Sequence, residues 1–313
     1  MTFAERPTSR RAVLTAFAAA ATAGAPVLGQ LASAAPAAAA TTGLDPTDPV
    51  EPLEYPSNTV LYQDPDLVEG TSYGRRFRRH EAFDPDLVTQ SAFPRTAILA
   101  LHGGGIEIGT SELALGIAGY DPGNITPTAP RLLSPVYDYF LFEGLLSSGN
   151  KALHVTSKNC DDHVALSLAR SHFNVLSLHG CTFGQLKLPA ADFPATGNRA
   201  VAVVGGLNAA FRTALVTEIK LAGFQAVDAY NPKYSPTLGE FNGSHVTNPC
   251  NLTMLSMGGQ LEMTTELRES LFGDSSSRAD RARTWKESEG RFQAFRDACR
   301  RAIATVESGQ PIL

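Results

Sequence analysis

Residues 96–107, Thr-Ala-Ile-Leu-Ala-Leu-His-Gly-Gly-Gly-Ile-Glu, decide the fold class of this chain. The first six residues form a short apolar run, which is typical of a β-strand buried on both faces. The run ends at His102, and three glycines follow it. The pattern recurs at residues 173–178, where Phe-Asn-Val-Leu-Ser-Leu leads directly to His179. Strands buried on both faces occur in parallel sheets covered by helices, so these two runs predict an α/β protein.

Strand and helix patterns alternate along the rest of the chain. Further strand candidates are residues 137–142, 152–155, 200–204 and 259–263, and helical spacing occupies residues 110–117, 164–169, 207–219, 266–271 and 279–306. This β-α-β-α order predicts a mainly parallel, twisted sheet with helices on both faces. No break in composition divides residues 56–313, so we expect a single domain there.

Two histidines and a glutamate are candidates for a metal site. His102 and His179 directly follow buried-type strands, and ligands of such sheets bind beyond the carboxyl ends of the strands. Glu107 follows His102 across three glycines, which let the backbone double back. Two imidazoles and a carboxylate leave a fourth tetrahedral position open for water, as a catalytic zinc requires. We expect one Zn²⁺ here; the alternative is two hydrogen-bonded crevice histidines beside a tight turn.

Two other classes of protein remain open at this point. A histidine followed by glycines also occurs in lipases and esterases, where the glycine amides form an oxyanion hole for a serine nucleophile. That mechanism needs a G-x-S-x-G pentapeptide, and none occurs in this chain. An exported binding protein without catalytic activity would keep the fold and need no acid–base residue.

Residues 102–113, HGGGIEIGTSEL, resemble the signature of the poly-γ-glutamate hydrolase family. Further segments resemble the family pattern in the same order: residues 142–144, 153–157, 177–180, 204–207, 259–262 and 267–268. The resemblance spans residues 72–300. It implies a zinc carboxypeptidase-like fold and makes residues 56–313 a single catalytic domain.

The resemblance also implies roles for individual residues. Zinc would be held by His102, Glu107 and His179, and Glu262 would act on the zinc-bound water. A carboxylate in that place can take a proton from water and give it to the leaving amine. The implied reaction is hydrolysis of γ-glutamyl amide bonds in poly-γ-glutamate, and γ-glutamyl linkages of cell-wall peptides are an open alternative. Internal or terminal cleavage and the preferred glutamate stereoisomer remain open.

Arginines are candidates for binding the carboxylates of such a polyanionic substrate. Guanidinium groups pair bidentately with carboxylates, which favours Arg268 as a substrate-binding residue. The run Arg75–Arg79 could act in the same way, although charge runs are usually solvent-exposed edges. His154 is expected to lie behind the metal ligands or in the core.

The N-terminal residues predict export. Arg10 and Arg11 precede a long alanine-rich apolar run, which is typical of a twin-arginine signal over residues 1–34. Residues 35–55 are expected to be a flexible linker. A membrane anchor is the alternative, but the run is mostly alanine and contains Gly24 and Pro26. We therefore expect passage through the twin-arginine export machinery, a secreted or extracytoplasmic location and no membrane span in the mature form.

Charge and cysteine content narrow the function further. The formal charge is −5, and removal of residues 1–34, with three arginines and one glutamate, changes it to −7. This balance excludes a typical nucleic-acid-binding protein. The four cysteines form no C-x-x-C pair, which argues against a cysteine zinc site. Their pairing is left open: Cys160, Cys181, Cys250 and Cys299.

Overall fold

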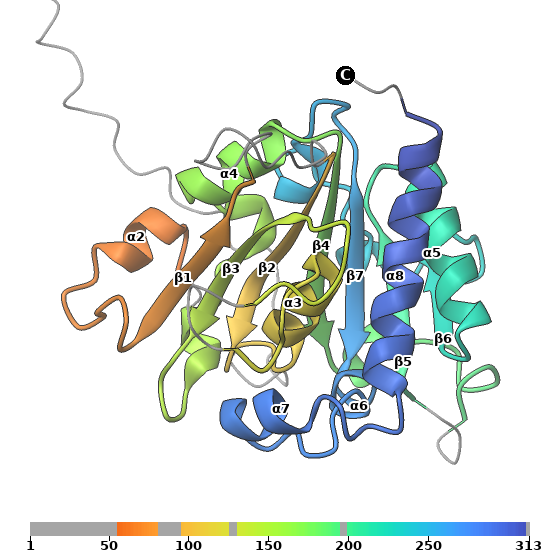
Figure 1. The fold of residues 1–313 in the computed structure, drawn as a ribbon. Coiled ribbons are helices and arrows are strands. Elements are labelled where there is room, and N and C mark those ends of the chain that lie inside the picture. Colours follow the sequence, from red (N-terminus) through yellow and green to blue (C-terminus); the bar gives the residue numbers. More distant parts are fainter. Residues whose placement is uncertain (1–54, 81–94, 125–129, 195–198, 311–313) are drawn as a thin grey trace, which may run out of the picture. The chain divides into compact units, whose positions relative to one another are not determined.

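A seven-stranded sheet forms the centre of the computed structural model (Figure 1). The structure describes residues 55–80, 95–124, 130–194 and 199–310. The strands, in their order across the sheet, are β1 (Tyr73–Arg78), β3 (Asp138–Gly144), β2 (Thr96–Gly104), β4 (Asn174–Cys181), β7 (Gly259–Thr264), β5 (Val201–Gly205) and β6 (Gln225–Asp228). The predicted export signal, residues 1–34, and all but the last residue of the predicted linker lie outside the described residues.

Most neighbouring strands are parallel. β2 runs parallel to β3 and to β4, β4 to β7, and β5 to β6, whereas β1–β3 and β5–β7 are antiparallel. The predicted mainly parallel sheet is confirmed, with two antiparallel pairs that the sequence patterns did not indicate. Because β5 opposes β7, only β3, β2, β4 and β7 bring their carboxyl ends to one common edge.

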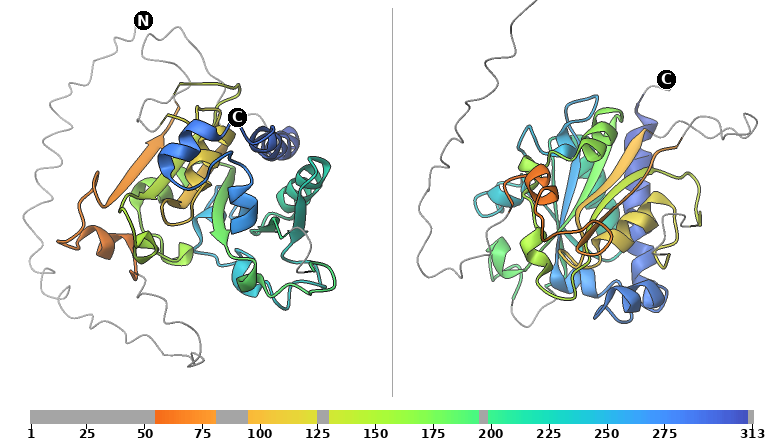
Figure 2. Two further views of the ribbon diagram at one scale, coloured as in Figure 1. Left: turned by 90° about the horizontal axis from the view of Figure 1, so that it is seen from below. Right: turned by 90° about the vertical axis from the view of Figure 1, so that its left-hand side faces the viewer.

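Helices cover both faces of the sheet, as predicted (Figure 2). Alternate residues of β2 enter two separate cores: Ile98 and Ala100 pack in one, and Leu99 and Leu101 in the other. The first core contains side chains of α3, α5 and α8, and the second contains side chains of α2 and α4. The helices are α2 (Asn58–Tyr62), α3 (Thr110–Ala118), α4 (His163–Arg170), α5 (Ala209–Leu221), α6 (Thr265–Glu269), α7 (Arg278–Thr284) and α8 (Arg291–Ser308), with short 3₁₀ turns η1 (Asn150–Leu153), η2 (Ser157–Asn159), η3 (Gly184–Leu186), η4 (Gly239–Phe241) and η5 (Pro249–Asn251).

Several predicted elements differ from the structure. The strand predicted at residues 152–155 is wrong, because residues 150–153 form the 3₁₀ turn η1. The single helix predicted over residues 279–306 is two helices, and the second begins after Gly290, which has a φ of +79°. The sequence pattern indicated only an arginine run at β1, because the charged side chains of this edge strand interrupt the apolar pattern of a strand.

None of the described helices is both long and apolar enough to cross a membrane. All four cysteines fall within the described residues, and each is a buried free thiol. The disulfide pairing that the sequence left open is therefore absent from this part of the chain.

Candidate metal centre

The carboxyl ends of β2 and β4 place two histidines side by side. Thr96–Leu99 of β2 pair with Asn174–Ser177 of β4, and both strands continue past this register to His102 and His179. The Nδ1 atoms of the two imidazoles lie 3.1 Å apart. Both residues are buried. The structure therefore brings together the two histidines that the strand ends predicted.

A glycine turn returns the chain so that Glu107 faces His102. Gly104 has a φ of +64°, and a Cβ at this position would lie 2.4 Å from the carbonyl oxygen of Gly144, so only glycine fits. The Glu107 amide donates to the His102 carbonyl over 2.9 Å. Glu107 Oε1 then lies 3.1 Å from His102 Nδ1, and Oε2 accepts a hydrogen bond of 2.7 Å from the Gly180 amide.

The outer nitrogens of the two imidazoles are held by other groups. His102 Nε2 lies 2.8 Å from the carbonyl oxygen of Val155, which only accepts, so this nitrogen carries the proton. His179 Nε2 lies 2.8 Å from the Ser177 hydroxyl. When His179 also carries its proton on Nε2, the Nδ1 lone pairs of His102 and His179 face each other, and a cation between them would satisfy both.

Burial and neighbouring charges shift the pKa values at this site. Burial raises the pKa of Glu107, but His102, His179 and His154 outweigh it and lower the pKa to about 2. Burial, reinforced by His102, lowers the pKa of His179 to about 3. Burial and the Glu107 charge raise the pKa of Glu262 well above its usual value. Glu107 is thus an anion and His179 a neutral imidazole at neutral pH, which are the forms that bind metals.

The spacing of these donors fits zinc. A tetrahedral zinc with bonds of about 2.1 Å holds its donor atoms about 3.4 Å apart. His102 Nδ1 lies 3.1 Å from His179 Nδ1 and 3.1 Å from Glu107 Oε1, while His179 Nδ1 lies 3.8 Å from Glu107 Oε2. Imidazole and carboxylate are also donors that zinc accepts. His102, Glu107 and His179 would hold the ion with little movement.

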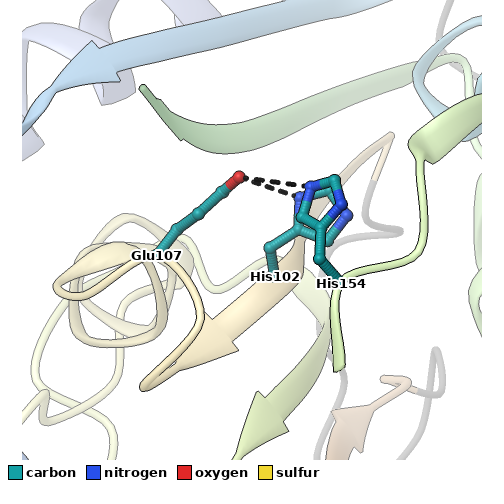
Figure 3. Close-up of side chains that lie close together, drawn as sticks. All are labelled: His102, Glu107 and His154. Atoms are coloured by element: carbon teal, nitrogen blue, oxygen red, sulfur yellow. Dashed lines mark hydrogen bonds and ion pairs between the residues drawn. The ribbon is translucent and has the colours of Figure 1, made fainter. Parts of the chain in front are cut away.

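His154 joins this cluster and was not predicted to do so. Its ring lies 3.8 Å from that of His102, centroid to centroid, and its Nε2 lies 3.7 Å from Glu107 Oε1 (Figure 3). Donor atoms of His102, Glu107 and His154 all lie within 4.8 Å of one another, which makes a second possible donor set. The residue precedes Val155, whose carbonyl fixes His102. Residues 152–155 were predicted to form a strand, and that prediction did not indicate that His154 lies beside His102.

Glu262 lies on β7 at the wall of the same cavity. The cavity has a volume of about 480 Å³, and its lining includes His102, Glu107, His179 and Glu262. Gln260 Nε2 donates to Glu262 Oε1 over 2.9 Å, which fixes the carboxyl group. A buried carboxyl with a raised pKa, beside a candidate metal site, is suited to exchange protons with water.

Arg268 lies at a second, smaller cavity next to the first. This cavity of about 250 Å³ is also lined by Lys151, and it shares Glu107, His154 and Gly180 with the larger one. Two cationic side chains thus flank the candidate metal centre on this side.

The arginine run of β1 does not reach the centre. Arg75 pairs with Glu69 and Asp162, and Arg76 pairs with the buried Glu143. These guanidinium groups are committed to carboxylates of the protein, so a role in substrate binding for Arg75 and Arg76 is not supported.

Relatives in Bacillus subtilis (strain 168) resemble this chain over part of their length. The UPF0714 protein YndL is 34% identical over 194 residues, which cover 61% of this chain and 61% of YndL. The SPbeta prophage-derived UPF0714 protein YoqZ is 33% identical over 190 residues, which cover 60% of this chain and 55% of YoqZ. The chain therefore spans less than two thirds of the length of these relatives.

Two solved structures have a similar fold. A bacteriophage poly-γ-glutamate hydrolase superposes with a TM-score of 0.59 at 23% identity, covering 82% of this chain and 99% of the phage chain. The zinc-free apo form of YndL superposes with a TM-score of 0.58 at 29% identity, covering 80% of this chain and 96% of the other. The model of the poly-gamma-glutamate hydrolase family matches residues 77–298, a range that contains every residue of the candidate centre. This chain therefore belongs to the poly-γ-glutamate hydrolase family.

Proposed function

We propose that this chain is a zinc hydrolase that cleaves γ-glutamyl amide bonds, with poly-γ-glutamate as its substrate. The observation that carries the proposal is the convergence of His102 Nδ1, His179 Nδ1 and the Glu107 carboxylate at 3.1–3.8 Å, in a cavity that Glu262 also lines. Membership of the family and the zinc-free state named for the YndL structure support the same reaction.

The side chains of the site divide the work of amide hydrolysis. Zinc held by His102, Glu107 and His179 would supply Lewis acidity toward the amide carbonyl. Glu262, in its ionised form, takes a proton from the attacking water and passes it to the leaving amine. The hydrogen bond from Gln260 keeps the Glu262 carboxyl directed at the cavity.

Cations beside the centre suit a polyanionic substrate. Each residue of a γ-linked glutamate chain carries a free α-carboxylate, and Lys151 lines the cavity next to Glu107. Lys158 lines the larger cavity. We propose that these groups favour a chain with regularly spaced carboxylates over neutral peptides.

A serine hydrolase fits the site less well. The hydroxyl of Ser177 lies 2.8 Å from His179 Nε2, and Ser177 is fully buried within β4. A substrate carbonyl cannot reach it, so this pair holds the imidazole in place.

Metal analysis combined with a cleavage assay tests the proposal. The purified protein should contain one zinc per chain and shorten poly-γ-glutamate, whereas α-linked polyglutamate should stay intact. A chelator should abolish cleavage, and added zinc should restore it. Activity that survives metal removal would favour the serine mechanism. If the protein cleaved γ-glutamyl cell-wall peptides but not poly-γ-glutamate, the peptides would be the substrate instead. Zinc binding without cleavage of any of these substrates would indicate a binding protein without catalytic activity.

We also propose export through the twin-arginine route. The support is the sequence pattern of Arg10 and Arg11 before the apolar run of residues 12–34. Replacing both arginines by lysine should hold the protein inside the cell, whereas Arg6→Lys should not. Unchanged export of the double variant would contradict the proposal.

A further inference from the structure

Arg268 makes contacts inside the protein that a substrate-binding side chain does not need. It lies in α6 and is 6% exposed. Its Nε donates to the Met263 carbonyl at 3.1 Å, its Nη1 to the Ile108 carbonyl at 2.7 Å, and its Nη2 to the Cys181 carbonyl at 3.5 Å. Nη2 also donates to the Thr265 hydroxyl at 3.2 Å. Most of the guanidinium N–H groups are thus used within the protein.

Each of the three carbonyl groups belongs to a segment that carries a site residue. Ile108 directly follows Glu107, Met263 directly follows Glu262, and Cys181 lies two residues beyond His179. One planar guanidinium therefore joins the glycine turn to the carboxyl ends of β4 and β7. Lysine has no such fork of fixed N–H directions, so it could not join three carbonyl groups in this way.

Gly180 makes room for this arrangement. A Cβ at Gly180 would lie 2.6 Å from Arg268 Nε and 2.7 Å from Cζ. The amide of the same residue donates to Glu107 Oε2 at 2.7 Å. The guanidinium thus lies against Gly180, between His179 and Cys181.

The Arg268 guanidinium forms no ion pair with a carboxylate of the described residues. Among the ion pairs between described residues none involves Arg268, whereas Arg75, Arg76 and Arg281 each pair with a carboxylate. All of its hydrogen-bond acceptors are neutral, and the nearby carboxylates of Glu107 and Glu262 offset part of the cost of burying its charge. Its hydrogen bonds fix the geometry of the three segments that it joins.

We propose that Arg268 is a positioning residue of the metal centre: it fixes Glu107, His179 and Glu262 relative to one another through the three carbonyl groups. The inference rests on the proposed zinc function and changes the role of Arg268 from binding substrate to organising the site. The two roles predict different measurements, because a positioning residue acts on the metal site before substrate arrives.

The test compares Arg268→Lys, Gly180→Ala and Lys151→Met with the wild-type chain. Arg268→Lys keeps the charge and loses the fork, and Gly180→Ala keeps Arg268 but displaces its guanidinium. Both should weaken zinc binding by roughly 10- to 100-fold in competition with a chromophoric chelator. Both should alter the visible absorption of the cobalt-substituted protein and lower kcat more than they raise KM. Lys151 also lines the smaller cavity but does not join the three carbonyl groups. Lys151→Met should therefore raise KM and leave zinc affinity and the cobalt spectrum unchanged.

Controls separate this inference from the proposed function and from misfolding. Arg301→Met removes an exposed guanidinium that pairs with Glu218 and should behave as wild type. Circular dichroism checks folding. If Arg268→Lys fails to fold, Gly180→Ala gives the same comparison, since the three atoms nearest to the added Cβ all belong to the Arg268 guanidinium. A wild-type chain that binds no zinc would refute the proposed function. Wild-type zinc binding with unchanged affinity and spectrum in both variants, and a raised KM, would overturn the positioning role.

Discussion

Glu262 lies directly opposite His179 in the ladder that joins β7 to β4. Paired residues of neighbouring parallel strands carry their side chains on the same face of the sheet, and both of these line the same cavity. The backbone hydrogen bonds of the sheet therefore fix the distance between the candidate acid–base group and a candidate zinc ligand. This arrangement and the contacts around it lead to the following predictions.

Glu262→Gln should abolish cleavage and preserve the metal site. The amide keeps the shape of the side chain but cannot take a proton from water, so kcat should fall by roughly 10²- to 10⁴-fold. Zinc content should remain at one ion per chain. The matched control is Glu269→Gln, an exposed position in α6, which should be fully active. Wild-type activity in Glu262→Gln would remove this residue from the mechanism.

His102→Ala, Glu107→Ala and His179→Ala should each lose zinc during gel filtration, as measured by elemental analysis. Each substitution removes one of three donor groups, whose nearest atoms lie 3.1–3.8 Å apart. The exposed His163→Ala should retain the metal. His154→Ala should also retain most of its zinc, because the His154 side chain is 25% exposed, whereas those of His102 and His179 are 3% and 2% exposed and face each other. Zinc loss in His154→Ala with retention in His179→Ala would identify the other donor set.

Ser177→Ala should weaken zinc binding by roughly 10- to 100-fold, since the hydroxyl 2.8 Å from His179 Nε2 orients the imidazole. Ser157→Ala should have a smaller effect, because its hydroxyl lies 3.4 Å from the same nitrogen. Competition with a chromophoric chelator measures both affinities. Equal affinities in Ser177→Ala and the wild type would show that β4 alone fixes the ring.

The metal-free chain should lose stability in acid from about pH 6.5 downward. The pKa of His179 falls from 6.5 to about 3 on folding, mainly through burial. Between these values the unfolded chain binds a proton that the folded chain does not, so stability rises with pH there, by up to about 1.4 kcal/mol per pH unit for one such proton. Below the folded pKa the loss is complete. Urea unfolding at several pH values should show a shallower dependence for His179→Asn, and identical slopes would contradict the shift.

Arg281→Met should destabilise the fold. Arg281 Nε donates to Glu112 Oε1 over 2.9 Å, and both side chains are buried. Removing one partner leaves a buried, unpaired charge and should lower the free energy of unfolding by about 3–5 kcal/mol. The double variant Arg281→Met with Glu112→Leu should lose less, because no charge remains. The exposed Arg283→Met is the control in urea titrations. Equal losses in the single and double variants would rule out the charge as the cause.

Local sequence patterns determined the central strands and their ends. The apolar runs before His102 and His179 required burial on both faces, and such strands align in parallel, so the two histidines had to meet at one edge. The glycines of the turn similarly required a backbone reversal that returns Glu107. These features follow from side-chain character over a few residues, which is why the sequence alone indicated them.

Only the tertiary structure decided the direction of each strand, the position of His154 at the site and the hydrogen bonds of Arg268. β5 runs against β7, although its apolar pattern is that of a parallel strand. Arg268 reaches the carbonyl of Ile108 across 160 positions of the chain. How whole elements pack decides strand direction, register and the hydrogen bonds between distant segments. The apolar pattern of a single segment does not predict these features. The sequence alone therefore determined that His102, Glu107 and His179 meet at the sheet edge, whereas packing decided how they are held there and added His154.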